Sequence, residues 1–126
     1  IRSKGIEPIL FMSWPYKNKP EMQEMLEKEF FKASKLNNLR LIPAGQAFLY
    51  INQNFPNINL YTKDLRHPSK EGTYLASLII FSSLSNKSPI GNTYIMDLDP
   101  GVAEILQKAA WKTHKDFQKR ITNSGL

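Results

Sequence analysis

Short apolar runs alternate with an amphipathic stretch in the first third of the chain. Residues 8–14, PILFMSW, form a continuous apolar run, which is typical of a strand buried on both faces of a parallel sheet. Across residues 20–38, apolar side chains recur at steps of three and four, which predicts an amphipathic helix. Residues 39–43, LRLIP, predict a second short strand. The order strand, helix, strand predicts a βαβ unit and therefore an α/β layered fold.

Helical spacing returns in three later segments. Residues 45–55 are compatible with a further helix, and an Asn- and Pro-rich loop follows it. The apolar-rich segment 70–84 predicts a long helix that begins after Ser69. Asp99 supplies the N-cap of a last helix, along which apolar residues recur as far as Ile121. Because no repeat, low-complexity tract or linker interrupts these segments, we expect one domain or part of one.

The composition is close to that of an average globular domain. The 126 residues suffice for one ordinary domain, and with 41% apolar and 22% charged residues the chain is expected to bury a core. Cysteine is absent, which excludes disulfides, thiolate metal sites and cysteine nucleophiles. The longest apolar stretch, residues 74–84, is shorter than the roughly 20 residues that cross a bilayer, so no membrane span is expected.

The formal net charge of +6 raises the question of a nucleic-acid partner. Four lysines recur along the predicted last helix and form one basic stripe: Lys108, Lys112, Lys115 and Lys119. The stripe lacks interleaved aromatic or arginine residues and a known docking motif, so a solvated helix face is favoured and no nucleic-acid partner is expected. His114 has only Asp116 nearby, which does not make a metal site, and we expect no cofactor.

Residues 64–67, DLRH, place a carboxylate three residues before a histidine and just ahead of a predicted helix. In a turn, this spacing lets Asp64 accept a hydrogen bond from one ring nitrogen of His67 and leaves the other nitrogen free. Such a pair suits a general base, because the carboxylate fixes the tautomer and the free nitrogen takes a proton from a nucleophilic hydroxyl. On these four residues alone, a structural role is favoured, in which Asp64 caps a turn and His67 packs under a loop.

The surrounding sequence shifts the balance toward catalysis. Residues 60–76, LYTKDLRHPSKEGTYLA, and residues 88–91, SPIG, resemble the last conserved block of the SGNH/GDSL hydrolases, which are serine esterases and acylhydrolases. Upstream, residues 11–16, FMSWPY, are similar to a strand-end segment of that family, and residues 41–48, LIPAGQAF, are similar to its IPVG-A segment. The resemblance therefore covers nearly all of residues 9–91.

The resemblance implies a fold and two catalytic roles. The implied fold is α/β, a three-layer parallel sheet flanked by helices of the SGNH or flavodoxin-like kind, with this chain as its C-terminal half. The resemblance also implies that His67 is the catalytic base and that Asp64 orients it. The substrate is then a carboxylic ester. Family members that act on glycans are often exported from bacterial cells, so the resemblance also implies export of this protein.

The nucleophile block of the family is missing from this sequence. SGNH enzymes carry their serine in a Gly-Asp-Ser turn, with oxyanion-hole donors in later blocks, and the chain contains no Gly-Asp-Ser. Ser69 is close to His67 in sequence, but capping the following helix is its favoured role. The chain also begins at Ile1 without a leader, so we expect residues 1–126 to be the C-terminal part of one hydrolase domain whose nucleophile half lies elsewhere. Alone, this part is expected to be nearly inactive.

Aromatic residues indicate where a substrate would bind. Trp14 and Tyr16 follow the first predicted strand, and ligands of open α/β sheets bind beyond the carboxyl ends of the strands. We expect their rings to form a platform for a sugar or acyl group, which favours an acetylated glycan as substrate. Packing of Trp14 against a neighbouring helix is an equally weighted alternative. For Arg66, a solvated position is favoured over contact with an anionic substrate group.

Two functions of other classes remain open. A non-catalytic carbohydrate-binding or structural module would keep the fold without the nucleophile half. A basic nucleic-acid-binding domain is a weaker option that rests on the net charge alone. The leading hypothesis is the serine-dependent ester hydrolase, because the motifs match that family in both pattern and order.

Overall fold

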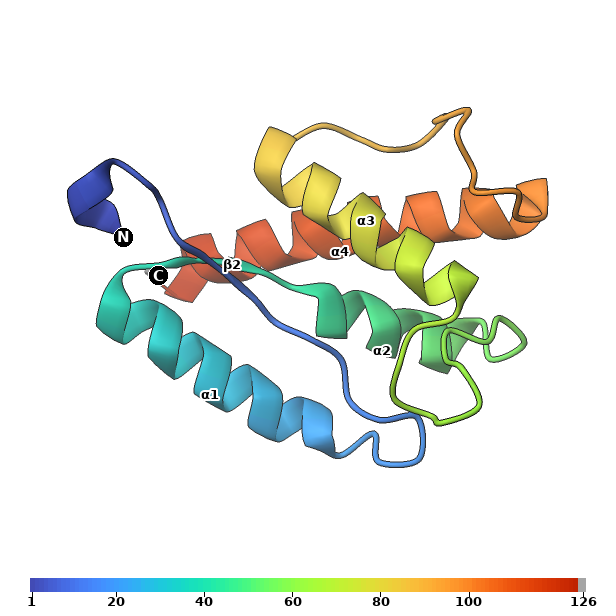
Figure 1. Cartoon of the computed structure of the whole chain (residues 1–126), viewed down its shortest axis with the longest axis horizontal. Helices are drawn as coiled ribbons and strands as arrows, with labels where there is room; N and C mark the ends of the chain where they lie inside the picture. Colours follow the sequence, from blue (N-terminus) through green and yellow to red (C-terminus); the bar gives the residue numbers. More distant parts are fainter. Residues whose placement is uncertain (125–126) are drawn as a thin grey trace.

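The computed structural model describes residues 1–124, in which two short strands lie among four α-helices (Figure 1). In chain order the elements are the 3-10 helix η1 Arg2–Lys4, β1 Ile9–Phe11, α1 Met22–Asn37, β2 Arg40–Ile42, α2 Ala44–Asn54, α3 Lys70–Ser85 and α4 Pro100–Ser124. The predicted helices and strands all form, although β1 is shorter than the apolar run that predicted it. Across this described range, no helix combines the length and apolar character that a membrane span needs.

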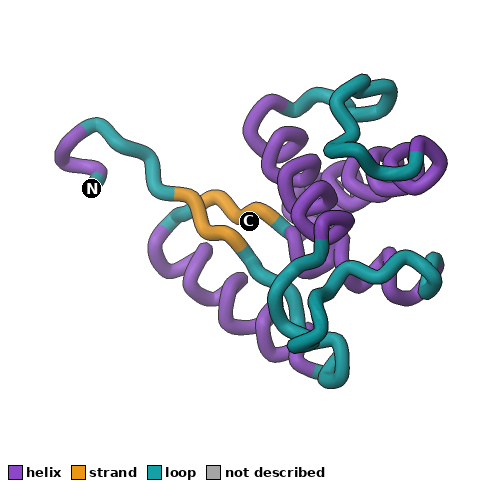
Figure 2. The backbone as a smooth tube through the Cα atoms, turned by 45° about the vertical axis from the view of Figure 1, so that its right-hand side comes forward, coloured by secondary structure: helices purple, strands orange, loops and turns teal. Residues whose placement is uncertain are grey.

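β1, α1 and β2 form the predicted βαβ unit. β1 and β2 pair in parallel, with Ile9 opposite Arg40 and Phe11 opposite Ile42. Figure 2 shows the two strands side by side in orange, with α1 connecting them. α1 ends where Asn38 adopts a left-handed backbone conformation with φ 50°, which asparagine tolerates better than most residues. The chain can therefore reverse immediately and enter β2.

The expected three-layer fold, with a parallel sheet flanked by helices, is wrong. Within residues 1–124 the sheet contains only β1 and β2, each three residues long. The predicted strand was also expected to be buried on both faces, but Phe11 is 36% exposed. After β2, the long apolar segments have helical rather than strand periodicity, so helix-on-helix packing supplies most of the core. The described residues form a mostly helical protein around a two-stranded unit.

The main core lies between α2, α3 and α4, which Figure 1 shows packed beside one another. Phe48 of α2, Leu75 of α3 and Leu106 of α4 are fully buried there. Burial of a large apolar side chain stabilises a fold by about 1.5–3 kcal/mol. A second cluster joins the strand region to the C-terminal half of α4 and contains Met12, Leu41 and Phe117. The helices thus form the rigid base on which the loops are held.

Two of the four stripe lysines of α4, Lys108 and Lys112, pair with acidic residues of the same helix. Lys108 Nζ lies 2.6 Å from Glu104 Oε1, and Lys112 Nζ lies 2.5 Å from Asp116 Oδ2. Hydrogen bonding, with charge attraction second, lowers the pKa of Glu104 and raises the pKa of Lys112. About half or more of each of these side chains is exposed. Lys108 and Lys112 therefore lie on an exposed helix face and are ion-paired within it.

The histidine of α4 is a core residue. His114 is 1% exposed, its ring stacks on Trp111, and its Nε2 lies 2.9 Å from Asn86 Oδ1. Burial lowers the pKa of His114, which favours the neutral ring. In the part of the chain that the structure describes, no group of three or more acidic or histidine side chains is arranged to hold a metal. His114 therefore serves packing at the end of α3.

Candidate active site

A tight turn between α2 and α3 carries the predicted catalytic pair. Oδ1 of Asp64 accepts hydrogen bonds from Thr62 Oγ1 at 2.8 Å and from the backbone N–H groups of Arg66 and His67 at 2.9 Å. The N–H of Thr62 donates to the carbonyl of His67 at 2.9 Å and closes the turn. Aspartate is favoured here because its short side chain reaches backbone N–H groups two and three residues on. Local bonds therefore fix the backbone of His67.

The side chains of Asp64 and His67 face each other across this turn. Asp64 Oδ2 lies 2.5 Å from His67 Nδ1. An ionised carboxylate only accepts hydrogen bonds, so Nδ1 carries the hydrogen of the neutral imidazole and Nε2 presents its lone pair. The His67 side chain is 79% exposed, and among residues 1–124 its ring has no other hydrogen-bond partner. An oriented imidazole with one free nitrogen is what a general base requires.

Hydrogen bonds hold the pKa of Asp64 well below its usual range. The largest effect comes from the side chain of His67, followed by the backbone N–H groups of Arg66 and His67 and the hydroxyl of Thr62. Each of these donors stabilises the charged carboxylate. Asp64 is therefore ionised at neutral pH, which is the state that orients a neutral imidazole and balances an imidazolium.

We expect the carboxyl of Asp64 to titrate below about 3.9, the usual pKa of an aspartate. Because the folded-state pKa is depressed, the charged group contributes stability above about pH 3.9 and loses it as the pH falls through the folded-state pKa. A carboxyl-detected NMR titration measures the midpoint, and Asp64→Asn should reduce the loss of stability in this acid range. A midpoint at or above 3.9 would contradict the hydrogen-bonded turn.

The segment that follows β1 holds the turn from its other side. The N–H of Lys17 donates to the carbonyl of Leu65 at 2.9 Å, and the indole N–H of Trp14 donates to the carbonyl of Arg66 at 3.0 Å. The guanidinium of Arg66 lies over the Tyr16 ring, with Cζ 4.8 Å from the ring centroid. Figure 1 shows the two loops meeting at one end of the molecule. The fold thus brings both predicted substrate-binding aromatics beside the predicted catalytic turn.

The two aromatic residues differ in their surroundings. Trp14 stacks on the buried Phe48, with ring centroids 4.2 Å apart and an angle of 5° between the rings. Tyr16 lines a pocket of about 420 Å³ together with Lys17 and Asn52. Sequence reasoning missed Lys17 and Asn52, because only the folded chain places α2 against the segment after β1. Lys17 Nζ donates to Asn59 Oδ1 at 2.9 Å and Asn52 Nδ2 donates to the Tyr61 hydroxyl at 3.3 Å. A sugar stacked on the Tyr16 ring would bond the remaining N–H groups of these two side chains.

The described residues place no nucleophile beside His67. Ser69 Oγ donates to the carbonyl of Asn59 at 2.7 Å and accepts from the N–H of Gly72 at 3.1 Å, so Ser69 is the N-cap of α3, as predicted. In residues 1–124, no hydroxyl lies within hydrogen-bond distance of the His67 ring. The turn therefore holds an imidazole with one free ring nitrogen and, among residues 1–124, no hydroxyl bonded to it.

Comparisons with known proteins did not identify a relative. No protein-family model, curated protein or solved structure matches the chain. The motif at residues 60–76 and the geometry of the turn that contains it are therefore the features that bear on function.

Proposed function

We propose that this chain supplies the histidine and aspartate of a serine-dependent carboxylic-ester hydrolase of the SGNH type. The proposal is carried by the 2.5 Å contact between Asp64 Oδ2 and His67 Nδ1, which leaves Nε2 exposed. The sequence motif gives the same two residues the same two roles. The nucleophilic serine and the oxyanion donors come from a polypeptide segment outside residues 1–126, the N-terminal half of the same domain.

In the proposed reaction, His67 moves a proton in each of two half-reactions. Nε2 takes the proton of the serine hydroxyl as Oγ bonds to the ester carbonyl carbon, and the imidazolium gives that proton to the leaving alcohol as the C–O bond breaks. A water molecule, deprotonated by Nε2, then attacks the acyl-enzyme. The carboxylic acid leaves as the serine oxygen regains the proton. Asp64 stays ionised throughout and balances the imidazolium charge.

A carbohydrate ester, such as an O-acetylated glycan, is the substrate class that we propose. The pocket lined by Tyr16, Lys17 and Asn52 supports this choice, since it combines a ring for stacking with an amide and an ammonium group. The hydrogen bond from Lys17 to the carbonyl of Leu65 connects the wall of this pocket to the catalytic turn. A sugar held there would present its ester close to the loop that carries the base. The mechanism requires no cofactor.

A non-catalytic carbohydrate-binding module is the second candidate. The Tyr16 pocket favours it independently, because sugar binding there needs neither a serine nor the imidazole of His67. In that case the contact between Asp64 and His67 would only stiffen the turn. The two candidates make different predictions for the same variants.

Fluorophosphonate labelling of the protein, made at the full length that its gene encodes, tests the proposal. We expect one serine outside residues 1–126 to be labelled and p-nitrophenyl acetate to be hydrolysed, whereas residues 1–126 alone should show neither reaction. Hydrolysis by residues 1–126 alone that His67→Ala abolishes would contradict an external nucleophile. Full-length protein without labelling or hydrolysis, but with sugar binding that His67→Ala leaves unchanged, would support the binding module.

A further inference from the structure

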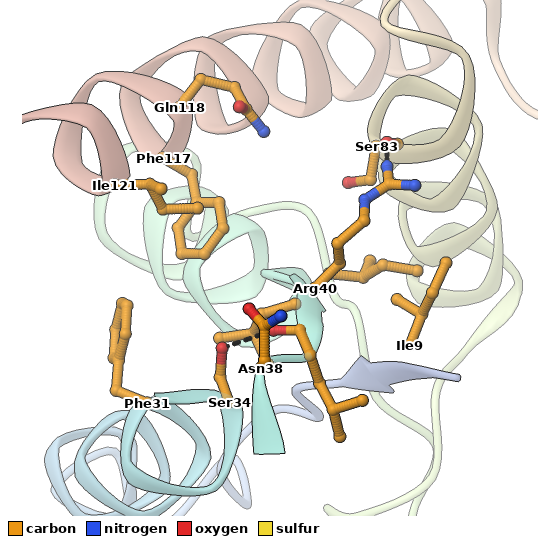
Figure 3. A pocket seen from close by; sticks show the side chains of 12 residues that line it. Ile9, Phe31, Ser34, Asn38, Arg40, Ser83, Phe117, Gln118 and Ile121 are labelled. Carbon is orange, nitrogen blue, oxygen red and sulfur yellow. Dashed lines mark hydrogen bonds between the residues drawn. The ribbon is translucent and has the colours of Figure 1, made fainter. Parts of the chain in front are cut away.

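A second pocket lies away from the catalytic turn, near the beginnings of the two strands. It has a volume of about 270 Å³, and β2 and parts of α1, α3 and α4 surround it (Figure 3). Ile9 and Arg40, the first residues of β1 and β2, line it. The Asp64–His67 turn instead contacts the segment that follows the end of β1. The two sites are therefore built from different residues and can be tested separately.

One end of this pocket is polar and carries a positive charge. Arg40 Nη2 donates to the carbonyl of Ser83 at 2.8 Å, which holds the guanidinium at the pocket wall. No carboxylate within residues 1–124 forms an ion pair with Arg40. Since a guanidinium has five N–H donors, further donors remain for a ligand. Figure 3 shows the amide of Gln118 on the facing wall.

A buried hydroxyl at the same end has no partner. Ser83 is 8% exposed, and its Oγ makes no hydrogen bond within the described part of the chain. Figure 3 shows the Ser83 side chain close to the guanidinium of Arg40 at the edge of the pocket. Leaving a buried polar group unsatisfied is costly, so such groups mark places where a ligand would supply the missing bond. Arg40 and Ser83 together therefore point to an oxygen-rich anion.

The other end of the pocket is apolar. Phe31 of α1 and Phe117 of α4 face each other with ring centroids 5.9 Å apart, and Ile121 lies next to Phe117 (Figure 3). These side chains offer a wall for a short alkyl or aryl group. At about 30 Å³ per water molecule, the pocket has roughly the volume of nine waters, which corresponds to a ligand of about eight to ten heavy atoms.

We propose that this pocket binds a small monocarboxylate with a short apolar tail. The planar guanidinium of Arg40 matches the two oxygens of a carboxylate, and Ser83 Oγ–H adds a third donor. The tail lies along Phe31 and Phe117, where its burial adds to the affinity. A carboxylate is favoured over a phosphate because the pocket holds one cation and is lined on its other side by apolar groups.

Titration with hexanoate tests this proposal on the protein at the full length that its gene encodes. Calorimetry and backbone NMR at neutral pH should show saturable binding, with shifts at Ser83, Gln118 and Ile121. Hexanamide has the same tail but no charge and should bind far more weakly. Arg40→Gln should weaken hexanoate binding on the order of 10- to 100-fold, since it removes the charged two-point contact with the carboxylate, and Ser83→Ala roughly 10-fold, since it removes a single hydroxyl donor.

Lys108→Gln is the control for the loss of one positive charge. Lys108 pairs with Glu104 on the exposed face of α4 and does not line the pocket. Its variant should bind hexanoate as the wild type does. Three results would overturn the proposal: no saturable binding at millimolar hexanoate, equal binding of hexanamide, or the same loss of affinity in Lys108→Gln and Arg40→Gln. The first result includes the case in which another segment of the protein fills the pocket.

Discussion

The His67→Ala variant, made at the full length that the gene encodes, should lose ester hydrolysis by a factor on the order of 10²–10⁴. Nε2 of His67 is the proposed acceptor of the serine proton, and alanine leaves no base in that position. Because the imidazole acts on the reacting atoms rather than on remote parts of the substrate, the loss should appear in kcat with KM little changed. Steady-state kinetics on p-nitrophenyl acetate and on an O-acetylated sugar measure both constants.

A comparison of the two histidines separates catalysis from folding. The His67 side chain is 79% exposed, so His67→Ala should leave the circular dichroism spectrum and the urea midpoint nearly unchanged. In His114→Gln, the amide of glutamine can still reach Asn86, but the buried ring is lost. That variant should unfold at lower urea and keep the kcat of the folded protein. An unchanged kcat in His67→Ala would contradict its role as the base.

Local signals in the sequence predicted most of the helices and the core of the site. Ser69 caps α3, and Asn38 ends α1 in a left-handed conformation, as residues of these types do at helix ends. The contact between Asp64 and His67 is equally local, because only two residues of a tight turn separate them. Such features depend on a few neighbouring residues, so the sequence pattern alone is sufficient to predict them.

The size of the sheet could not be predicted in the same way. The apolar run at residues 8–14 indicated a strand, but the number of its neighbours depends on segments far away in the chain. In the structure, Trp14 from this run stacks on Phe48 of α2, whereas Phe11 stays partly exposed. The apolar side chains that a wide sheet would have buried are buried by helices instead. The periodicity of a segment shows which of its faces is apolar, but not which other element packs on that face.

The surroundings of the site are also set by long-range contacts. The hydrogen bond from Trp14 Nε1 to the carbonyl of Arg66 joins residues 52 positions apart. The guanidinium of Arg66 lies over the Tyr16 ring because the same two loops lie side by side. The sequence predicted that Trp14 and Tyr16 follow a strand, but it did not predict which residues they contact. The contact of His67 with Asp64 was therefore predictable, whereas the residues that surround this pair were not.

The Gly72→Ala variant should lose both stability and catalysis. Gly72 is buried in the first turn of α3, and a Cβ there would overlap the carbonyl oxygen of Leu60 and lie 3.0 Å from Pro68 Cβ. That carbonyl accepts the N–H of Ser69 at 2.9 Å, so displacing it weakens the start of α3 and moves the segment that carries His67. Overpacking of this kind lowers the free energy of unfolding by about 1–3 kcal/mol. A shift of about 1 Å at the base would lower the rate roughly 10²-fold.

Gly101→Ala is the matched control, because it adds the same methyl group to the first turn of another helix. Gly101 is exposed at the start of α4, and the nearest neighbour of its Cβ would be Asp99 Oδ1 at 3.1 Å, a side-chain atom that accepts the N–H of Val102 and has to shift by only a few tenths of an ångström. Alanine favours a helix over glycine by about 0.5–1 kcal/mol, so this variant should be as stable as the wild type or more stable. Urea unfolding followed by circular dichroism compares the two variants. If Gly72→Ala were as stable as Gly101→Ala, the Leu60 segment would not pack on α3, and the position of His67 would lose its support.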